Sequence, residues 1–140
     1  MRCANELRVV LDTNVLVSAI AFPGETTGLI LDLLEARAFK AFSSPEILAE
    51  LRHVLIRKVG LADGAADAVI SELAEQHSVI SPQMRISEIR CKDSDNRVLE
   101  CALEAHADVI VTGNMRHIRP LKHYRSIAIL TPREFLMKFF

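Results

Sequence analysis

Two stretches of the sequence decide the fold: LRVVLDTN at residues 7–14 and VIVTGN at residues 109–114. Each is a short run of aliphatic and β-branched residues that ends abruptly in polar side chains. Short continuous apolar runs are typical of strands that are buried on both faces of a parallel sheet. Ligands of such sheets bind outside the carboxyl ends of the strands. The two stretches therefore predict two buried strands with polar ends, and these ends form one site if the strands are parallel neighbours.

The rest of the chain alternates between strand and helix patterns. Further strands are predicted near residues 39–42, 78–80 and 125–130. Helices are predicted after the first strand up to Pro23, and over residues 26–37, 45–58, 63–77, 95–106 and 132 onwards. The helix over residues 45–58 is preceded by a cap at Ser44 and has Pro45 at its first position. The last helix opens with a capping box at Thr131 and Glu134. Since crossover connections are right-handed and place helices on both faces, we predict an α/β/α sandwich with a mainly parallel central sheet, as a single domain over residues 1–140.

The composition is that of a globular protein with one hydrophobic core. Half of the 140 residues are hydrophobic and a quarter are charged, unlike a disordered chain. The net charge is −1, but residues 113–140 hold six Lys and Arg against one Glu, so a basic end with a net charge of +5 follows an acidic body with −6. This distribution is compatible with a polyanion bound near acidic groups, and equally with a solvated basic surface.

Cysteine usage and the apolar runs bear on the cellular compartment. The three cysteines are odd in number and form no C-x-x-C pair, which argues against a disulfide framework or a zinc site. The N-terminal residues lack the apolar segment of a signal peptide, and no apolar run approaches the length of a membrane span. We therefore expect a cytoplasmic protein that does not bind or span a membrane.

Polar residues at the ends of the two strands are the first candidates for a functional site. Asp12 and Asn14 follow the first strand, and Thr112 and Asn114 follow the second. If the strands are neighbours, these side chains converge on one edge of the sheet. Two structural readings remain open, because Asp12 can simply cap the next helix and the sequence Thr-Gly-Asn is also common in turns.

Two further acids are placed where they can join this edge. Asp95 lies at the start of the helix that leads into the second strand, where an ordinary helix cap is the alternative. Glu50 lies at the margin of the apolar stripe of its helix, where a solvated charge is the alternative. Converging carboxylates repel one another unless a cation neutralises them. Oxygen ligands without a His or Cys cluster suit Mg²⁺ or Mn²⁺.

Four segments, in this order and spacing, resemble one known family: LDTNVLVSA, SPEILAEL, DSDNRVLECALEAHADVIVTGN and TPREFL. The sequence is similar to PIN domains, specifically to the small bacterial and archaeal PIN proteins that are the toxins of VapBC-like toxin–antitoxin systems. The resemblance runs over essentially the whole chain. It implies an α/β/α sandwich, metal-dependent cleavage of RNA by three or four acids, and an antitoxin as protein partner. The aliphatic helix surface at Leu29, Ile30, Leu33 and Leu34 is compatible with a homodimer or an antitoxin groove, and core packing is the alternative.

The resemblance assigns the acids position by position. Asp12 matches the first acid of the family, Glu50 the second and Asp95 the third, with Asp93 as a nearby competitor for the third position. The last motif of many relatives ends in Thr-Gly-Asp, whereas this chain has Asn114. An amide oxygen can ligate a metal but brings no negative charge, so we expect weaker metal binding rather than loss of function.

The implied chemistry is hydrolysis by a metal-bound water, with Mg²⁺ or Mn²⁺ as cofactor. Asp12, Glu50 and Asp95 would be metal ligands or, through a water, a general base, while Asn14 and Thr112 would orient a ligand or the phosphate. The basic segment after the second strand offers candidate contacts to RNA, namely Arg116, His117, Arg119 and Lys122.

Two alternatives compete with the nuclease hypothesis. Asn114 is also compatible with a catalytically weakened PIN module that binds RNA or a protein without efficient cleavage. A small phosphatase or phospho-acceptor domain also has an Asp at the end of its first strand. Against the latter, the position two residues after Asp12 is Asn14 rather than a second acid.

Overall fold

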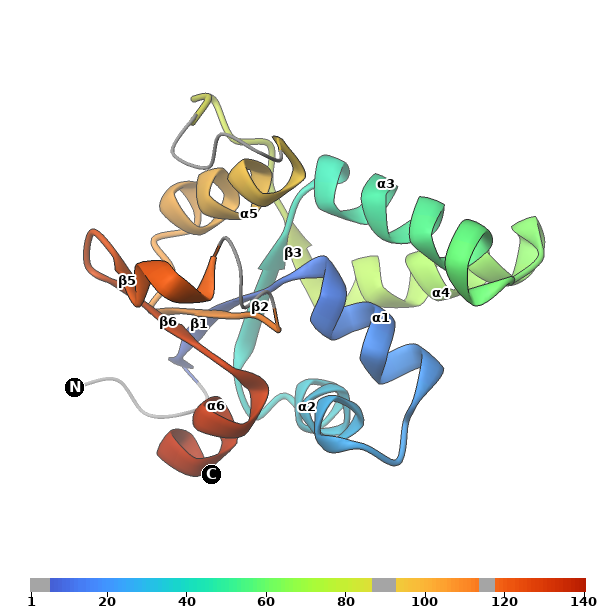
Figure 1. Cartoon of the computed structure of the whole chain (residues 1–140), viewed down its shortest axis with the longest axis horizontal. Coiled ribbons are helices and arrows are strands. Elements are labelled where there is room, and N and C mark those ends of the chain that lie inside the picture. The colour runs from blue at the N-terminus through green and yellow to red at the C-terminus, as the bar shows by residue number, and fades with distance from the viewer. Residues whose placement is uncertain (1–5, 87–92, 114–117) are drawn as a thin grey trace.

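The computed structural model describes residues 6–86, 93–113 and 118–140, and within these ranges it leaves out the side chains of Asp93, Ser94 and Arg119. A six-stranded sheet forms the centre, in the order β3-β2-β1-β4-β6-β5 (Figure 1). All neighbours are parallel except β5, which pairs antiparallel with β6. The strands are β1 (Arg8–Leu11), β2 (Lys40–Ser43), β3 (His77–Val79), β4 (Val109–Val111), β5 (His123–Tyr124) and β6 (Ile127–Leu130).

α-Helices connect β1 to β2, β2 to β3 and β3 to β4, and helices cover both faces of the sheet (Figure 1). The α-helices are α1 (Thr13–Ala21), α2 (Thr26–Glu35), α3 (Pro45–Val54), α4 (Asp63–Gln76), α5 (Asp93–Glu104) and α6 (Pro132–Phe139). A π-helical segment, η2 (Leu55–Val59), continues α3, and a 3₁₀ turn, η3 (Arg119–Leu121), precedes β5.

Successive residues of β1 point to opposite faces and build two hydrophobic cores. Val9 and Leu11 belong to the core that also contains residues of α1, α2, α3, α4 and α6. Val10 belongs to the other core, which consists mainly of residues of α5 and its neighbours. The predicted α/β/α sandwich with a mainly parallel sheet is therefore confirmed.

Local signals at helix ends were also correct in two places. Thr131 Oγ1 accepts a hydrogen bond from the Glu134 N–H at 3.2 Å, and Glu134 Oε1 accepts one from the Thr131 N–H at 2.8 Å, which forms the predicted capping box. Ser44 Oγ accepts from the Ile47 N–H at 3.2 Å and caps α3 as predicted.

The structure differs from the sequence prediction at several boundaries. The helix expected to reach residue 58 is α-helical only to Val54, and the π-helical turn after it ends at Gly60 with φ +87°. The strand predicted over residues 125–130 begins at Ile127, because Arg125 with φ +55° lies in the turn between β5 and β6. The two-residue strand β5 was not predicted, since two residues are too short to show a period.

Among the described residues no single helix is long and apolar enough to cross a membrane, and α1 and α2 meet that test only as a pair bent by 97°.

Candidate active site

The ends of β1 and β4 lie side by side at the carboxyl edge of the sheet. Leu11 is in register with Val111, and the N–H of Asp12 donates to the Val111 carbonyl at 3.0 Å. The N–H of Thr112 donates to the Leu130 carbonyl of β6 at 2.9 Å. The expected convergence of the two strand ends is therefore present in the structure.

The side chains at these ends are in direct contact. The Thr112 hydroxyl donates a hydrogen bond of 2.7 Å to Oδ2 of Asp12. Asp12 stands at the N-cap position of α1, but its side chain makes no capping hydrogen bond there. The Asp12 side chain therefore does not cap α1, and the capping alternative is wrong.

Burial and neighbouring charges raise the pKa of the Asp12 carboxyl. The residue is only 3% exposed, and its pKa rises from the ordinary value of 3.8 to about 6, mainly because burial removes the carboxylate from water. The hydrogen bonds from Thr112 and the Thr13 backbone lower this pKa, whereas the charges of Asp95 and Glu50 raise it. Asp95 and Glu50 are therefore near enough to Asp12 for their charges to act on its carboxyl.

The two other acids come from different helices. Asp95 is buried in the first turn of α5, and Glu50 is half-buried on α3. Asn14 is exposed in the first turn of α1. Four elements, β1, β4, α3 and α5, therefore contribute to this part of the carboxyl edge.

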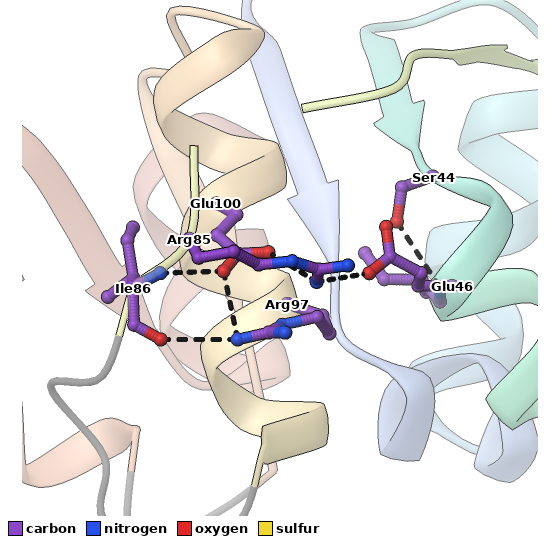
Figure 2. A network of polar contacts seen from close by, with 7 residues as sticks. Ser44, Glu46, Arg85, Ile86, Arg97 and Glu100 are labelled. Atoms are coloured by element: carbon purple, nitrogen blue, oxygen red, sulfur yellow. Dashed lines mark hydrogen bonds and ion pairs between the residues drawn. The ribbon is translucent and has the colours of Figure 1, made fainter. Parts of the chain in front are cut away.

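A network of arginine–carboxylate contacts fixes α5 (Figure 2). Glu100 is 1% exposed, and its Oε2 accepts from the Ile86 N–H at 2.7 Å and lies 2.9 Å from Nη2 of Arg97. The same guanidinium donates to the Ile86 carbonyl at 3.2 Å. The Glu100 carboxylate and the Arg97 guanidinium therefore hold the backbone of Ile86 against α5, the helix that carries Asp95.

The network extends to α3 through Arg85. Its Nη1 lies 3.4 Å from Oε1 of Glu100 and 2.5 Å from Oε2 of Glu46 in the first turn of α3 (Figure 2). The two helices that carry Asp95 and Glu50 are therefore braced against each other. Sequence reasoning missed this network; its one local signal is the three-residue spacing between Arg97 and Glu100 on an apolar helix face.

The basic residues predicted to contact RNA are described only in part. Lys122 is exposed, and its carbonyl accepts from the Ile129 N–H near the carboxyl end of β6. Lys122 therefore lies toward the same edge as Thr112. The side chains of Asp93 and Arg119, and all of Asn114, Arg116 and His117, lie outside what the structure describes.

The donor chemistry of this edge fits a hard divalent cation. Asp12, Asp95 and Glu50 supply carboxylate oxygens, and the desolvated Asp12 carboxylate faces two further negative charges. In the described part of the chain, no three His, Cys, Asp or Glu side chains lie close enough together to hold a metal ion. The fit to a cation therefore rests on the chemistry of the donor atoms and not on a preformed cluster.

Comparisons with known proteins identify the family of this chain. Residues 8–116 match the family model described as PIN domain. A relative from Methanocaldococcus jannaschii, an uncharacterized protein, is 28% identical over 96% of this chain and 92% of its own length.

Two solved structures share the fold. VapBC2 from Rickettsia felis, bound to a DNA fragment from its promoter, matches with a TM-score of 0.65 and 19% identity, over 88% of this chain and 97% of the other. VapBC-1 from nontypeable Haemophilus influenzae matches with a TM-score of 0.63 and 17% identity, over 91% and 99%. Because the family model spans most of the chain, the protein belongs to the PIN-domain family, a family of nucleases.

Proposed function

We propose that this protein is a Mg²⁺- or Mn²⁺-dependent endoribonuclease and the toxin of a toxin–antitoxin pair. One observation carries the proposal: a buried carboxylate, Asp12, is held by Thr112 and repelled by Asp95 and Glu50 at the carboxyl edge of the sheet. Such repulsion costs free energy in the absence of a cation and becomes binding energy in its presence.

The proposed roles follow from the positions of the side chains. Thr112 fixes one carboxylate oxygen of Asp12 and so orients that carboxylate. Asp12 and Asp95, both buried, are the ligands, and the half-buried Glu50 completes the set or accepts a proton from the attacking water. When bound, the cation would supply a water of lowered pKa and positive charge against the developing oxyanion. Lys122 and the basic residues before it would contact phosphates of the RNA.

Asn114 is the position that separates the leading proposal from the weakened-module alternative. Asn114→Asp restores the acid that many relatives carry, so it should tighten Mn²⁺ binding roughly 10-fold or more if residue 114 lies in the metal shell. Isothermal titration calorimetry measures this affinity, and the cleavage rate is followed in parallel. A large gain in rate from a nearly inactive wild type would favour the weakened module.

An antitoxin is proposed as the protein partner, with a homodimer as the assembly. Both solved structures of similar fold are VapBC complexes. In this chain a cavity of about 210 Å³ lies between α1, α2 and α4, with apolar residues such as Ile20 and Val69 in its lining. Asp32, Glu35 and Glu72 also line it, and this combination suits an amphipathic helix with a basic face.

Of the aliphatic residues of α2, Ile30 and Leu34 belong to the core, whereas Leu29 is half exposed and remains available to a partner.

The test of the proposed activity is cleavage of an end-labelled single-stranded RNA with Mn²⁺, Mg²⁺ or EDTA. Asp12→Asn and Asp95→Asn proteins, purified in the same way, control for contaminating nucleases. We expect cleavage that requires both the metal and the two carboxylates. Equal cleavage by wild type and variants would assign the activity to a contaminant and contradict the proposal.

A further inference from the structure

A second hollow of the surface lies beside the candidate active site. A cavity of about 500 Å³ opens between the end of α1, the start of α2 and the start of α6. Its lining combines an aromatic ring, Phe22, with a cation, Arg133, and with the hydroxyls of Ser18, Thr26 and Thr131. The carboxylate of Glu25 also lies in this lining, at the start of α2.

The chain that leaves β6 links the lining of the cavity to the carboxyl edge of the sheet. Thr131 directly follows Leu130, whose carbonyl accepts a hydrogen bond from the N–H of Thr112. Thr112 in turn donates to Asp12. One wall of the cavity therefore begins next to the residue that holds the buried carboxylate.

Helix α1 connects the two sites along its other wall. Asn14 and Ser18 are four residues apart on α1, and Phe22, four residues further, is the C-cap residue whose N–H donates to the Ser18 carbonyl. The three positions therefore follow one another along the helix axis. At a rise of about 1.5 Å per residue, Asn14 and Phe22 are about 12 Å apart along the axis. A single strand that leaves the active edge along α1 would reach the Phe22 ring within this distance.

The Phe22 ring is exposed although its backbone is firmly held. The side chain is 61% exposed, while the Phe22 N–H donates to the Ser18 carbonyl at 2.8 Å. The loop after it packs tightly on α2, because a Cβ at Gly28 would lie 1.9 Å from the carbonyl oxygen of Pro23. Thr27 also donates to Ser18 across this loop at 3.0 Å. The fold therefore presents an aromatic ring to solvent on a rigid support.

We propose that this cavity binds an unpaired nucleotide of the RNA substrate, displaced along α1 from the scissile phosphate. The proposal deepens the proposed function and rests on it. Phe22 would stack on the base, and Arg133 would contact a phosphate. Glu25 disfavours a phosphate at its end of the cavity and offers an acceptor to a base amino group. Stacking on an aromatic ring requires a splayed base, so the cavity selects single-stranded rather than duplex RNA.

The test compares Phe22→Ala with Phe22→Tyr, which keeps a stacking ring. Met137→Ala is the matched control, because Met137 is 76% exposed and lies further along α6. Binding of a fluorescein-labelled single-stranded RNA is measured by anisotropy in the Asp12→Asn background, and kcat and KM are measured without that substitution. Phe22→Ala should weaken binding roughly 5- to 100-fold and raise KM, with kcat and the Mn²⁺-induced shift in Tm unchanged. Phe22→Tyr should recover most of the RNA affinity that Phe22→Ala loses, and Met137→Ala should leave binding and cleavage unchanged.

The outcomes separate this inference from the function on which it rests. If the wild type cleaves RNA but Phe22→Ala binds and cleaves equally well, only the assignment of the cavity is overturned. If Phe22→Ala leaves RNA affinity unchanged and converts a dimer into a monomer in light scattering, the ring belongs to a protein interface and the inference is also overturned. If the wild type neither binds nor cleaves RNA, the proposed function fails and this inference with it.

Discussion

Two buried carboxylates, Glu100 on α5 and Asp12 near it, have charged neighbours of opposite sign. Glu100 of α5 is 1% exposed and is met by Arg97, Arg85 and a backbone N–H. Asp12 at the end of β1 is 3% exposed and is met by the Thr112 hydroxyl and by the charges of two other acids. Arginine side chains balance the negative charge of Glu100, whereas the neighbouring acids disfavour a negative charge on Asp12.

The difference indicates different roles for the two groups. A buried ion pair holds secondary structures in a defined relation, as Glu100 does for α5, although the buried Nε of Arg97 has no hydrogen-bond partner among the described residues. A buried carboxylate with a raised pKa among like charges is typical of functional sites. The Glu100 network therefore maintains the geometry that the Asp12 site requires.

The largest expected effect is the loss of the Glu100 network. Glu100→Ala leaves the Arg97 guanidinium without its buried partner, so the free energy of unfolding should fall by about 3–5 kcal/mol. Urea denaturation measures this change. Arg85→Ala is the control, because the Arg85 side chain is 65% exposed and solvent screens its contacts, and its effect should be much smaller. Equal effects of the two substitutions would contradict the central role of Glu100.

The second prediction has the opposite sign. The pKa of Asp12 is raised in the folded protein, so its stabilising contribution is complete below pH 4 and is lost as the pH rises through about 6. In EDTA at pH 7, Asp12→Asn should therefore stabilise the protein, by up to about 3 kcal/mol.

Thermal unfolding in EDTA at pH 4 to 8 checks this second prediction. The wild type and Asp12→Asn should converge in stability at the acidic end and diverge as the pH rises. A constant difference between them over this range would show that the Asp12 carboxyl titrates as an ordinary exposed group.

The smallest effect concerns the hydrogen bond between the two strand ends. Thr112→Val keeps the shape of the side chain and removes the donor to Asp12, which should cost about 1–2 kcal/mol at pH 7. It should also raise the pKa of Asp12 further, because this hydrogen bond lowers it. Thr112→Ser keeps a hydroxyl and should retain most of the stability. If Val and Ser at this position are equivalent, the hydrogen bond does not contribute.

The Asp12 site was predictable from the sequence because its signals are local. Continuous apolar runs predict buried parallel strands, and such strands place Asp12 and Thr112 at one edge. The alternation of elements likewise predicted the sandwich. The family resemblance added Glu50 and Asp95, which pattern alone could not separate from a solvated charge and a helix cap.

The Glu100 network was not predictable because its partners are distant in the sequence. The Ile86 N–H and the Arg85 side chain come from a segment without strand or helix periodicity. Within α5, an acid on the buried face resembles a break in the apolar pattern until its partners are known. Contacts that depend on tertiary packing give only a weak signal in the local sequence pattern.

The most direct test of the account is a crystal structure of the wild type with Mn²⁺, analysed by anomalous scattering. The account predicts a peak bound by carboxylate oxygens of Asp12 and Asp95 at about 2.0–2.2 Å, and the loss of this peak in Asp12→Asn crystals. Crystals at saturating Mn²⁺ with no peak at this edge, or with Mn²⁺ bound only elsewhere, would contradict it.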